Sequence, residues 1–288
     1  HALNTKGGVH SEFTIMRETE HSFYLVSAGA FQRLDHDWIL KWMPNDGSVQ
    51  FENLTNSTGV LVVSGPKARD LMKKVSTDDF SNENFKWLSS KKVDIGYAPC
   101  TAMRVNFVGE LGWELHHPIE YQNHVFDKLM ENGKELGIKP FGIRAMNSLR
   151  VEKSYKLVGT ELSIEYSPYE SGLDRFIHPN KGNFIGLEAL NKWREKGFQN
   201  KLVTMEVHNI TDADVLGNNP IYENGKVVGR ATGGDFGFRL NKSIALGMVK
   251  PDLATTGQKL KIDILGKMHD ATILDESPYD PENKLLRA

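Results

Sequence analysis

The feature that most limits the possible folds is a change of texture near residue 200. Beyond it, short apolar strands are separated by turn residues, with no helical pattern between them. These strands are predicted at 203–207, 226–232, 244–249 and 259–264. Asn224-Gly225 stands directly before the second strand and is a strong signal for a tight hairpin. Repeated short strands without helices predict a small antiparallel β-barrel over residues 200–288.

The earlier part of the chain mixes strands with helices. Strands are predicted at 13–17, 23–27, 60–63, 103–107 and 113–115, and helices at about 34–42, 121–135 and 143–154. The first two strands form a hairpin-like pair. This mixture, with much antiparallel character, predicts an α+β region over residues 1–181. Residues 182–199, with a helix at about 187–196, are the predicted connector to the barrel.

Composition argues against several classes of partner. The net charge is −2, from 35 basic and 37 acidic residues scattered along the chain, so no strong field would collect nucleic acid or an anionic membrane. No apolar run approaches the ~20 residues that a membrane span requires. The single cysteine, Cys100, excludes an internal disulfide and a thiolate metal cluster. Its apolar surroundings favour a buried, inert thiol. We therefore expect a reducing compartment, cytoplasmic or, in a eukaryote, the mitochondrial matrix.

The segment 107–115 carries the strongest functional signal. Gly109 and Gly112 lie three residues apart among aliphatic and aromatic residues, which lets backbone and ligand approach closely. Two carboxylates, Glu110 and Glu114, stand in the same segment. A planar nitrogen heterocycle offers paired N–H donors that one such carboxylate can accept. Further along, the chain reads Met146-Asn147-Ser148-Leu149-Arg150-Val151-Glu152-Lys153.

Together these two segments resemble the folate-binding core of the glycine cleavage T-protein (aminomethyltransferase) family. The resemblance continues through residues 7–15, 167–173, 184–186 and 229–234. It implies T-protein-like α+β domains followed by a small C-terminal barrel, with tetrahydrofolate as cofactor. Within the family, the motifs are most similar to the C-terminal folate part of flavin-dependent dimethylglycine and sarcosine dehydrogenases. The Gly-x-Gly-x-x-Gly fingerprint is missing from this chain, so FAD and its domain are expected elsewhere in the full-length protein.

The resemblance implies one-carbon chemistry. Oxidation of an N-methylated amine, such as dimethylglycine or sarcosine, leaves an electrophilic iminium that tetrahydrofolate must capture before water does. The protein then has to hold the pterin, exclude solvent and place negative charge near the cation. Two other functions stay open. One is a stand-alone aminomethyl- or methyltransferase, of the glycine cleavage or sulfonium demethylase type, and the other is a non-catalytic folate-binding relative.

The resemblance also assigns residues. Glu114 is expected to accept the pterin's N–H donors, and Glu110 to share this role or to orient the turn. The family's essential aspartate falls at Glu12, which can stabilise the iminium or relay a proton; the alternative is a solvent-facing strand acid. Tyr169 is expected to close over the folate or to pack in a turn. Arg175 is expected to hold the folate's glutamate tail or to form an ordinary surface ion pair.

Three further features bear on these alternatives. Met146 stands where T-proteins carry an arginine, and a thioether cannot pair with a carboxylate, which favours the flavin-linked members. His116-His117 resembles a metal pair. Neighbouring strand residues point to opposite faces, however, and no third ligand is suitably spaced, so no metal site is predicted. The chain opens with His1 directly before a strand pattern from the middle of a domain, so a fragment of a longer protein is expected.

Overall fold

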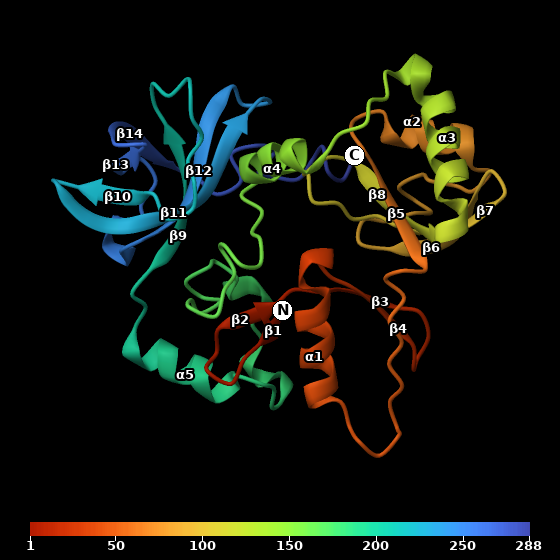
Figure 1. Cartoon of the computed structure of the whole chain (residues 1–288), viewed down its shortest axis with the longest axis horizontal. Helices are drawn as coiled ribbons and strands as arrows, with labels where there is room; N and C mark the ends of the chain where they lie inside the picture. The colour runs from red at the N-terminus through yellow and green to blue at the C-terminus, as the bar shows by residue number, and fades with distance from the viewer. The chain divides into compact units, whose positions relative to one another are not determined.

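The computed structural model describes residues 1–288, which fold into two compact units (Figure 1). The first unit combines residues 1–28 with 147–281, and the second combines residues 29–146 with 282–288. Each unit contains a hydrophobic core of its own. None of the helices combines the length and apolar content that crossing a bilayer requires.

The predicted C-terminal barrel is confirmed, and it is closed. Its antiparallel strands follow the order β10-β11-β12-β9-β14-β13, and β10 pairs with β13 to complete the ring. Asn224 and Gly225 form the predicted hairpin turn between β10 and β11, with positive φ angles of 49° and 76°. The strands are β9 (Lys201–Val207), β10 (Pro220–Glu223), β11 (Lys226–Gly237), β12 (Lys242–Val249), β13 (Lys259–Ile264) and β14 (Lys267–Leu274).

Smaller elements complete the first unit. Two-stranded sheets pair β1 (Ala2–Leu3) with β2 (Val9–Ser11) and β3 (Thr14–Arg17) with β4 (Phe23–Val26), the latter being the predicted hairpin. The predicted connector helix is α5 (Leu187–Lys196). Helix α4 spans Ile143–Glu152, and its residues from 147 onward belong to this unit. It packs Val151 against Ile244 and Leu246 of β12, all three fully buried, so its position on the barrel is fixed by apolar contact.

A four-stranded antiparallel sheet, in the order β5-β8-β7-β6, forms the centre of the second unit. Its strands are β5 (Thr58–Ser64), β6 (Ser90–Ile95), β7 (Ala98–Met103) and β8 (Gly112–Pro118). Two helices, α2 (Ala68–Val75) and α3 (Gln122–Gly133), pack their apolar residues on one face (Figure 1). Helix α1 (Gln32–Trp42) precedes β5 in the chain. Helices α1 and α3 occur where the apolar spacing predicts them.

The strand predicted at 103–107 is wrong. Alternating apolar residues there resemble a strand, but β7 ends at Met103. The Asn106 side chain instead organises a turn. Its Oδ1 accepts hydrogen bonds from the amides of Val108 (3.0 Å) and Gly109 (3.1 Å), and its Nδ2 donates to the carbonyl of Glu110 (2.6 Å). Asparagine side chains commonly replace backbone partners in this way, and here the result is a compact turn before β8.

Candidate functional site

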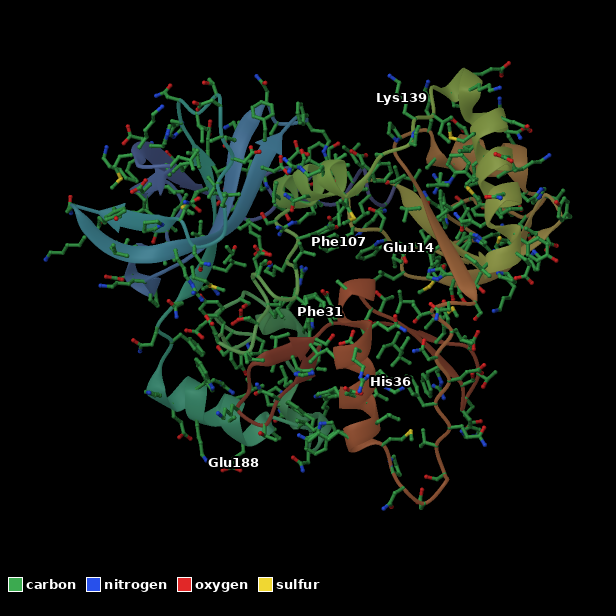
Figure 2. All side chains as sticks on the ribbon, viewed as in Figure 1. Phe31, His36, Phe107, Glu114, Lys139 and Glu188 are labelled. Carbon is green, nitrogen blue, oxygen red and sulfur yellow. The ribbon has the colours of Figure 1, made fainter.

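Glu114 lies on the face of the sheet opposite α2 and α3. Its neighbours on β8, Trp113 and Leu115, are fully buried in the core beneath those helices. Side chains alternate between the two faces of a strand, so Glu114 projects away from the helices (Figure 2). The residues opposite it are Val62 on β5 and Met103 on β7. Apolar side chains therefore flank the carboxylate on both neighbouring strands.

The Glu114 carboxylate has a single protein partner. Its Oε2 lies 3.3 Å from Nε2 of His116, which is two residues further along the same strand face. The Glu114 side chain is 21% exposed, whereas His116 is only 3% exposed. No protein donor is bonded to Oε1 of Glu114. A carboxylate has about four acceptor positions, so most of this acceptor capacity is available to a ligand.

The glycines before β8 shape the turn. Gly109 has a φ of 73°, in the left-handed region that favours glycine. At Gly112 an added Cβ would lie 2.5 Å from the carbonyl oxygen of Val63. The glycine spacing predicts a close approach at this turn. At Gly112, the group that approaches closely is the backbone of β5. Glu110 lies half-buried between the two glycines, with its carbonyl oxygen bonded to Asn106.

An aromatic cluster anchors the strand that carries Glu114. The Trp113 ring contacts Phe80 edge-on at 5.2 Å between centroids and Phe85 at 6.0 Å. All three side chains are fully buried. The guanidinium carbon of Arg104 lies 5.7 Å from the Trp113 ring centroid, within cation–π range. A site built on such a rigid strand can hold its carboxylate in one geometry.

Glu12 belongs to the first unit, directly after β2. Ser11 before it is buried, but the Glu12 side chain is 43% exposed. Its Oε1 lies 3.6 Å from Nε2 of His1, which makes an ion pair only when that imidazole is protonated. Glu12 is therefore a half-exposed acid at the end of a strand. Its catalytic role stays a prediction.

The two remaining predicted folate contacts differ in their surroundings. Tyr169 is half-buried, packs against the apolar cluster around Leu190, and lies 5.4 Å from the ring of Phe198. Arg175 is exposed, with its guanidinium 4.7 Å from the ring of Phe176. Tyr169 therefore has the contacts of a packing residue, and Arg175 lies on the surface. Folate contacts by either residue stay predictions.

Glu170, next to Tyr169, connects two loops. It is 1% exposed, and its Oε2 accepts the backbone amide of Ser167 at 3.0 Å. Its Oε1 accepts the backbone amides of Gln199 (3.1 Å) and Asn200 (2.9 Å). These amides lie outside helices and strands, so one buried carboxylate satisfies donors that regular structure leaves open.

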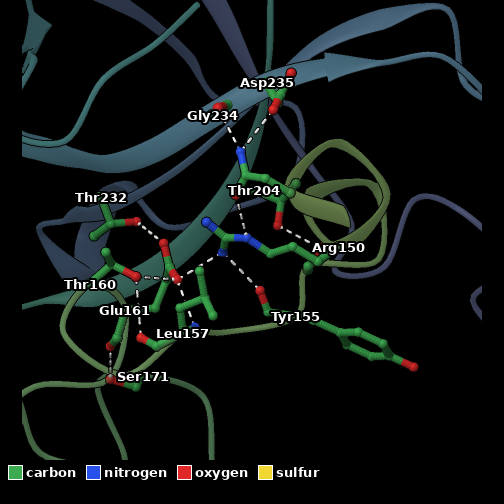
Figure 3. Close-up of polar contacts among 12 residues, drawn as sticks. Arg150, Tyr155, Leu157, Thr160, Glu161, Ser171, Thr204, Thr232, Gly234 and Asp235 are labelled. Carbon is green, nitrogen blue, oxygen red and sulfur yellow. Dashed lines mark hydrogen bonds and ion pairs between the residues drawn. The ribbon is translucent and has the colours of Figure 1, made fainter. Parts of the chain in front are cut away.

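The buried charged residues at the end of α4 have protein partners, and Figure 3 shows those of Arg150. Arg150 is 3% exposed, and its Nη1 lies 2.9 Å from Oε2 of Glu161, which is fully buried. Glu161 also accepts hydrogen bonds from the Leu157 amide (2.9 Å) and from the hydroxyls of Thr160 (2.7 Å) and Thr232 (2.5 Å). Both oxygens of the buried Glu161 carboxylate are therefore hydrogen-bonded, and such bonds are what make a buried ion pair tolerable in an interior.

Glu152 and Lys153, at the end of the same motif, are buried as well. Glu152 pairs with the Arg239 guanidinium and accepts the backbone amides of Arg239 (2.7 Å) and Leu240 (3.1 Å). The Lys153 ammonium donates to the carbonyl oxygens of Tyr279 (3.1 Å) and Asp280 (2.5 Å). The charges of this motif thus fix the end of α4 to the barrel and to the segment that follows the barrel in the chain.

Two other polar side chains in the second unit are buried. Cys100 is 4% exposed on β7, so its predicted burial is confirmed, and burial raises the pKa of its thiol to about 11. Asp35 on α1 is 3% exposed, and neither of its carboxylate oxygens has a hydrogen-bond partner. No group of three or more His, Cys, Asp or Glu side chains is placed to hold a metal ion.

The fold and the relatives agree on the class of protein. The crystal structure of glycine cleavage system aminomethyltransferase T from Bartonella henselae matches 97% of this chain and 74% of its own, with a TM-score of 0.83 and 19% sequence identity. That likeness shows the fold. Family models match the GCVT N-terminal domain over residues 1–181 and the glycine cleavage T-protein C-terminal barrel domain over residues 200–280.

Relatives of two kinds are similar in sequence. Human mitochondrial dimethylglycine dehydrogenase is 37% identical over 278 residues, which cover 96% of this chain and 32% of the human protein. The aminomethyltransferase of Thermoanaerobacter sp. (strain X514) is 32% identical over 283 residues, covering 98% of this chain and 75% of that enzyme. This chain therefore belongs to the glycine cleavage T-protein family of folate-dependent aminomethyltransferases. It spans about a third of the length of the dimethylglycine dehydrogenases.

Sequence reasoning missed the partners of the key side chains. His116 is the hydrogen-bonding partner of Glu114, and the signal for it was available, because residues two apart share a strand face. The partner of Arg150 carried no such signal. Glu161 lies eleven residues away, in a segment without regular structure, and reaches Arg150 only through the tertiary fold.

Proposed function

We propose that this chain binds tetrahydrofolate through Glu114 and that the bound folate accepts a one-carbon unit from an N-methylated amine such as dimethylglycine or sarcosine. Membership of the aminomethyltransferase family supports the acceptor. Sequence similarity to dimethylglycine dehydrogenases supports the donor, and with it a flavin domain in the whole protein that oxidises the amine.

The surroundings of Glu114 carry this proposal. The edge of a reduced pterin presents paired N–H donors on a flat ring, and a carboxylate accepts two parallel N–H bonds with matching geometry. Oε1 of Glu114 has no protein donor, and Val62 and Met103 provide apolar surface on the neighbouring strands. The residues present therefore fit the group.

Each side chain has a distinct proposed task. When bound, tetrahydrofolate supplies the nucleophilic nitrogen that takes up the one-carbon unit. Glu114 orients the ring, and His116 fixes the Glu114 carboxylate through Oε2. Glu12 is proposed to place negative charge near the cationic donor and to hold or release a proton at its own carboxylate.

Calorimetric titration with tetrahydrofolate tests the assignment of Glu114. Hydrogen bonds to charged groups contribute about 1.5–3 kcal/mol each, so Glu114→Ala is expected to weaken binding at least ~10-fold. Glu120→Gln, an exposed acid two residues beyond β8, is the matched control and should bind like the wild type. Equal affinities of the wild type and Glu114→Ala would remove this site assignment.

Two alternatives predict different results. A stand-alone aminomethyltransferase is favoured by the 75% coverage of the Thermoanaerobacter enzyme. The intact mass of the full-length gene product separates it from the flavin-linked protein, which must be far longer. A non-catalytic folate-binding relative would bind tetrahydrofolate, but Glu12→Gln would leave one-carbon transfer unchanged. A catalytic Glu12 predicts slower transfer in this variant at unchanged folate affinity.

A further inference from the structure

A cavity of about 430 Å³ opens at one mouth of the barrel, in the first unit. Phe236 on β11 pairs with Ser243 on β12, and Ser243 pairs in turn with Val207 on β9. Val207 belongs to the buried core of the barrel, as does Ala245 two residues beyond Ser243. The Phe236 and Ser243 side chains therefore form the outermost layer of the barrel interior. Mouths of β-barrels are frequent sites of ligand binding.

The Ser243 hydroxyl is the polar group of this cavity that needs a partner. Ser243 is only 7% exposed, and its Oγ makes no hydrogen bond within the protein. Burying a hydroxyl without a hydrogen bond is unfavourable. Because Ser243 lines the cavity, a ligand seated there can satisfy this oxygen.

The loop between β9 and β10 forms the other wall. Val215 in this loop is 1% exposed and lies above Gly234, where an added Cβ would be 2.9 Å from the Val215 Cβ. Ile210 and Ala213 pack on the barrel core and also line the cavity. The loop is thus held against the mouth by its apolar residues.

The charged lining of the cavity has one sign. Asp212 and Asp214 come from the same loop, and no Lys, Arg or His lines the cavity. The Phe236 ring forms another part of the wall and is supported edge-on by Phe238, with 5.0 Å between centroids. Carboxylates attract a cation, and an aromatic face adds cation–π attraction for an ammonium group. With no third acidic or imidazole ligand, the arrangement suits an organic cation better than a metal ion.

We propose that the barrel mouth binds a substituted ammonium ion that carries at least one N–H. The N–H donates to Ser243 Oγ, the charge lies near Asp212 and Asp214, and the alkyl groups contact Phe236 and Ile210. None of the residues that line this cavity is among those proposed to bind folate or to act on the one-carbon unit.

Titrations followed by amide NMR test the proposal, with trimethylammonium chloride as the probe. Trimethylammonium should shift the amides of Phe236, Ser243 and the 208–216 loop. It should bind at least ~5-fold more tightly than tetramethylammonium, which lacks an N–H, and than neutral tert-butanol of similar size. The preference over tetramethylammonium should vanish in Ser243→Ala, which loses no internal hydrogen bond and should fold normally.

Further variants test the role of charge and the location of the site. Asp214→Asn should weaken trimethylammonium binding several-fold, whereas Asp252→Asn, an exposed acid elsewhere on the barrel domain, should not. Glu114→Ala should leave the binding unchanged. The proposal is overturned if tert-butanol binds as well as trimethylammonium, if Ser243→Ala and Asp214→Asn both bind like the wild type, or if Glu114→Ala abolishes binding.

Discussion

The two motifs that relate this chain to its family use their charges in opposite ways. At the end of α4, Arg150, Glu152 and the following Lys153 are buried, and each is bonded to protein groups. On β8, Glu114 is partly exposed and keeps one oxygen without a protein donor. Charge in a motif therefore does not by itself indicate a ligand site. What distinguishes the two regions is whether protein partners already occupy the hydrogen-bonding capacity of each side chain.

The largest effect is expected at the buried pair of α4. Glu161→Gln leaves Arg150 charged and without its counter-ion in the interior, and breaking a buried pair costs about 3–5 kcal/mol. Urea denaturation should show this loss in the free energy of unfolding. Glu188→Gln is the matched control, because Glu188 pairs with Lys192 on the surface and should contribute little. Equal unfolding midpoints for the two variants would contradict a structural role for the α4 charges.

Asp35 is a buried acid of a third kind. It is buried like Glu161, but its carboxylate has no hydrogen-bond partner. Asp35→Asn removes a charge that no hydrogen bond or ion pair compensates, and we expect stability to increase by about 1–3 kcal/mol. Thermal and urea unfolding measure the change. Asp37→Asn, an exposed acid in the same helix that is paired with Arg33, should show little change. A destabilised Asp35→Asn protein would mean that its carboxylate does have a stabilising partner.

At Glu114 the stability effect should be small. Its carboxylate has His116 as its one polar partner and is partly exposed, so Glu114→Gln should change the free energy of unfolding by less than about 0.5 kcal/mol. Urea denaturation measures this change in the free energy of unfolding. A loss comparable to that of Glu161→Gln would place Glu114 with the structural charges and would remove the contrast between the motifs.

The smallest effect concerns Cys100, on the face of the same sheet that α2 and α3 cover. Its thiol pKa is raised from 9.0 to about 11 by burial, so near neutral pH the thiolate fraction is roughly 100-fold below that of an unshifted thiol. Iodoacetamide should therefore modify the folded protein very slowly and the urea-unfolded protein readily.

The raised pKa of the Cys100 thiol also predicts that the free energy of unfolding depends on pH. The unfolded chain loses the thiol proton at lower pH than the folded chain does. The contribution of Cys100 is thus fully present below about pH 9 and declines as the pH rises towards 11. Rapid alkylation of the native protein at neutral pH would contradict a dry interface between the sheet and its helices.

The elements with clear periodicity could be predicted from sequence. Helix α5 and the Asn224-Gly225 hairpin follow directly from apolar spacing and turn chemistry. Strand β6 was missed because Lys91 and Lys92 interrupt its apolar pattern, and β14 because it begins Lys-Met-His-Asp. Both are held in place by pairing with neighbouring strands, which no local pattern reveals.

The position of Glu114 on the sheet could be predicted to a similar extent. Alternation along β8 is enough to separate Glu114 from the core residues Trp113 and Leu115. The sequence could not reveal that Met103 would lie opposite Glu114, since that depends on the strand register. Nor could it reveal the Asn106 turn that replaces a strand, because Val105 and Phe107 fit the alternation of a strand equally well.

The carboxylate of Glu170 has a consequence for local motion. Because it holds the amides of Ser167, Gln199 and Asn200, these protons are shielded although no helix or strand contains them. In deuterated solvent they should exchange with protection factors typical of regular structure, and the loops at 167–172 and 197–200 should open only together. The loops at 167–172 and 197–200, although neither is a helix or a strand, are thus expected to behave as one cooperative element.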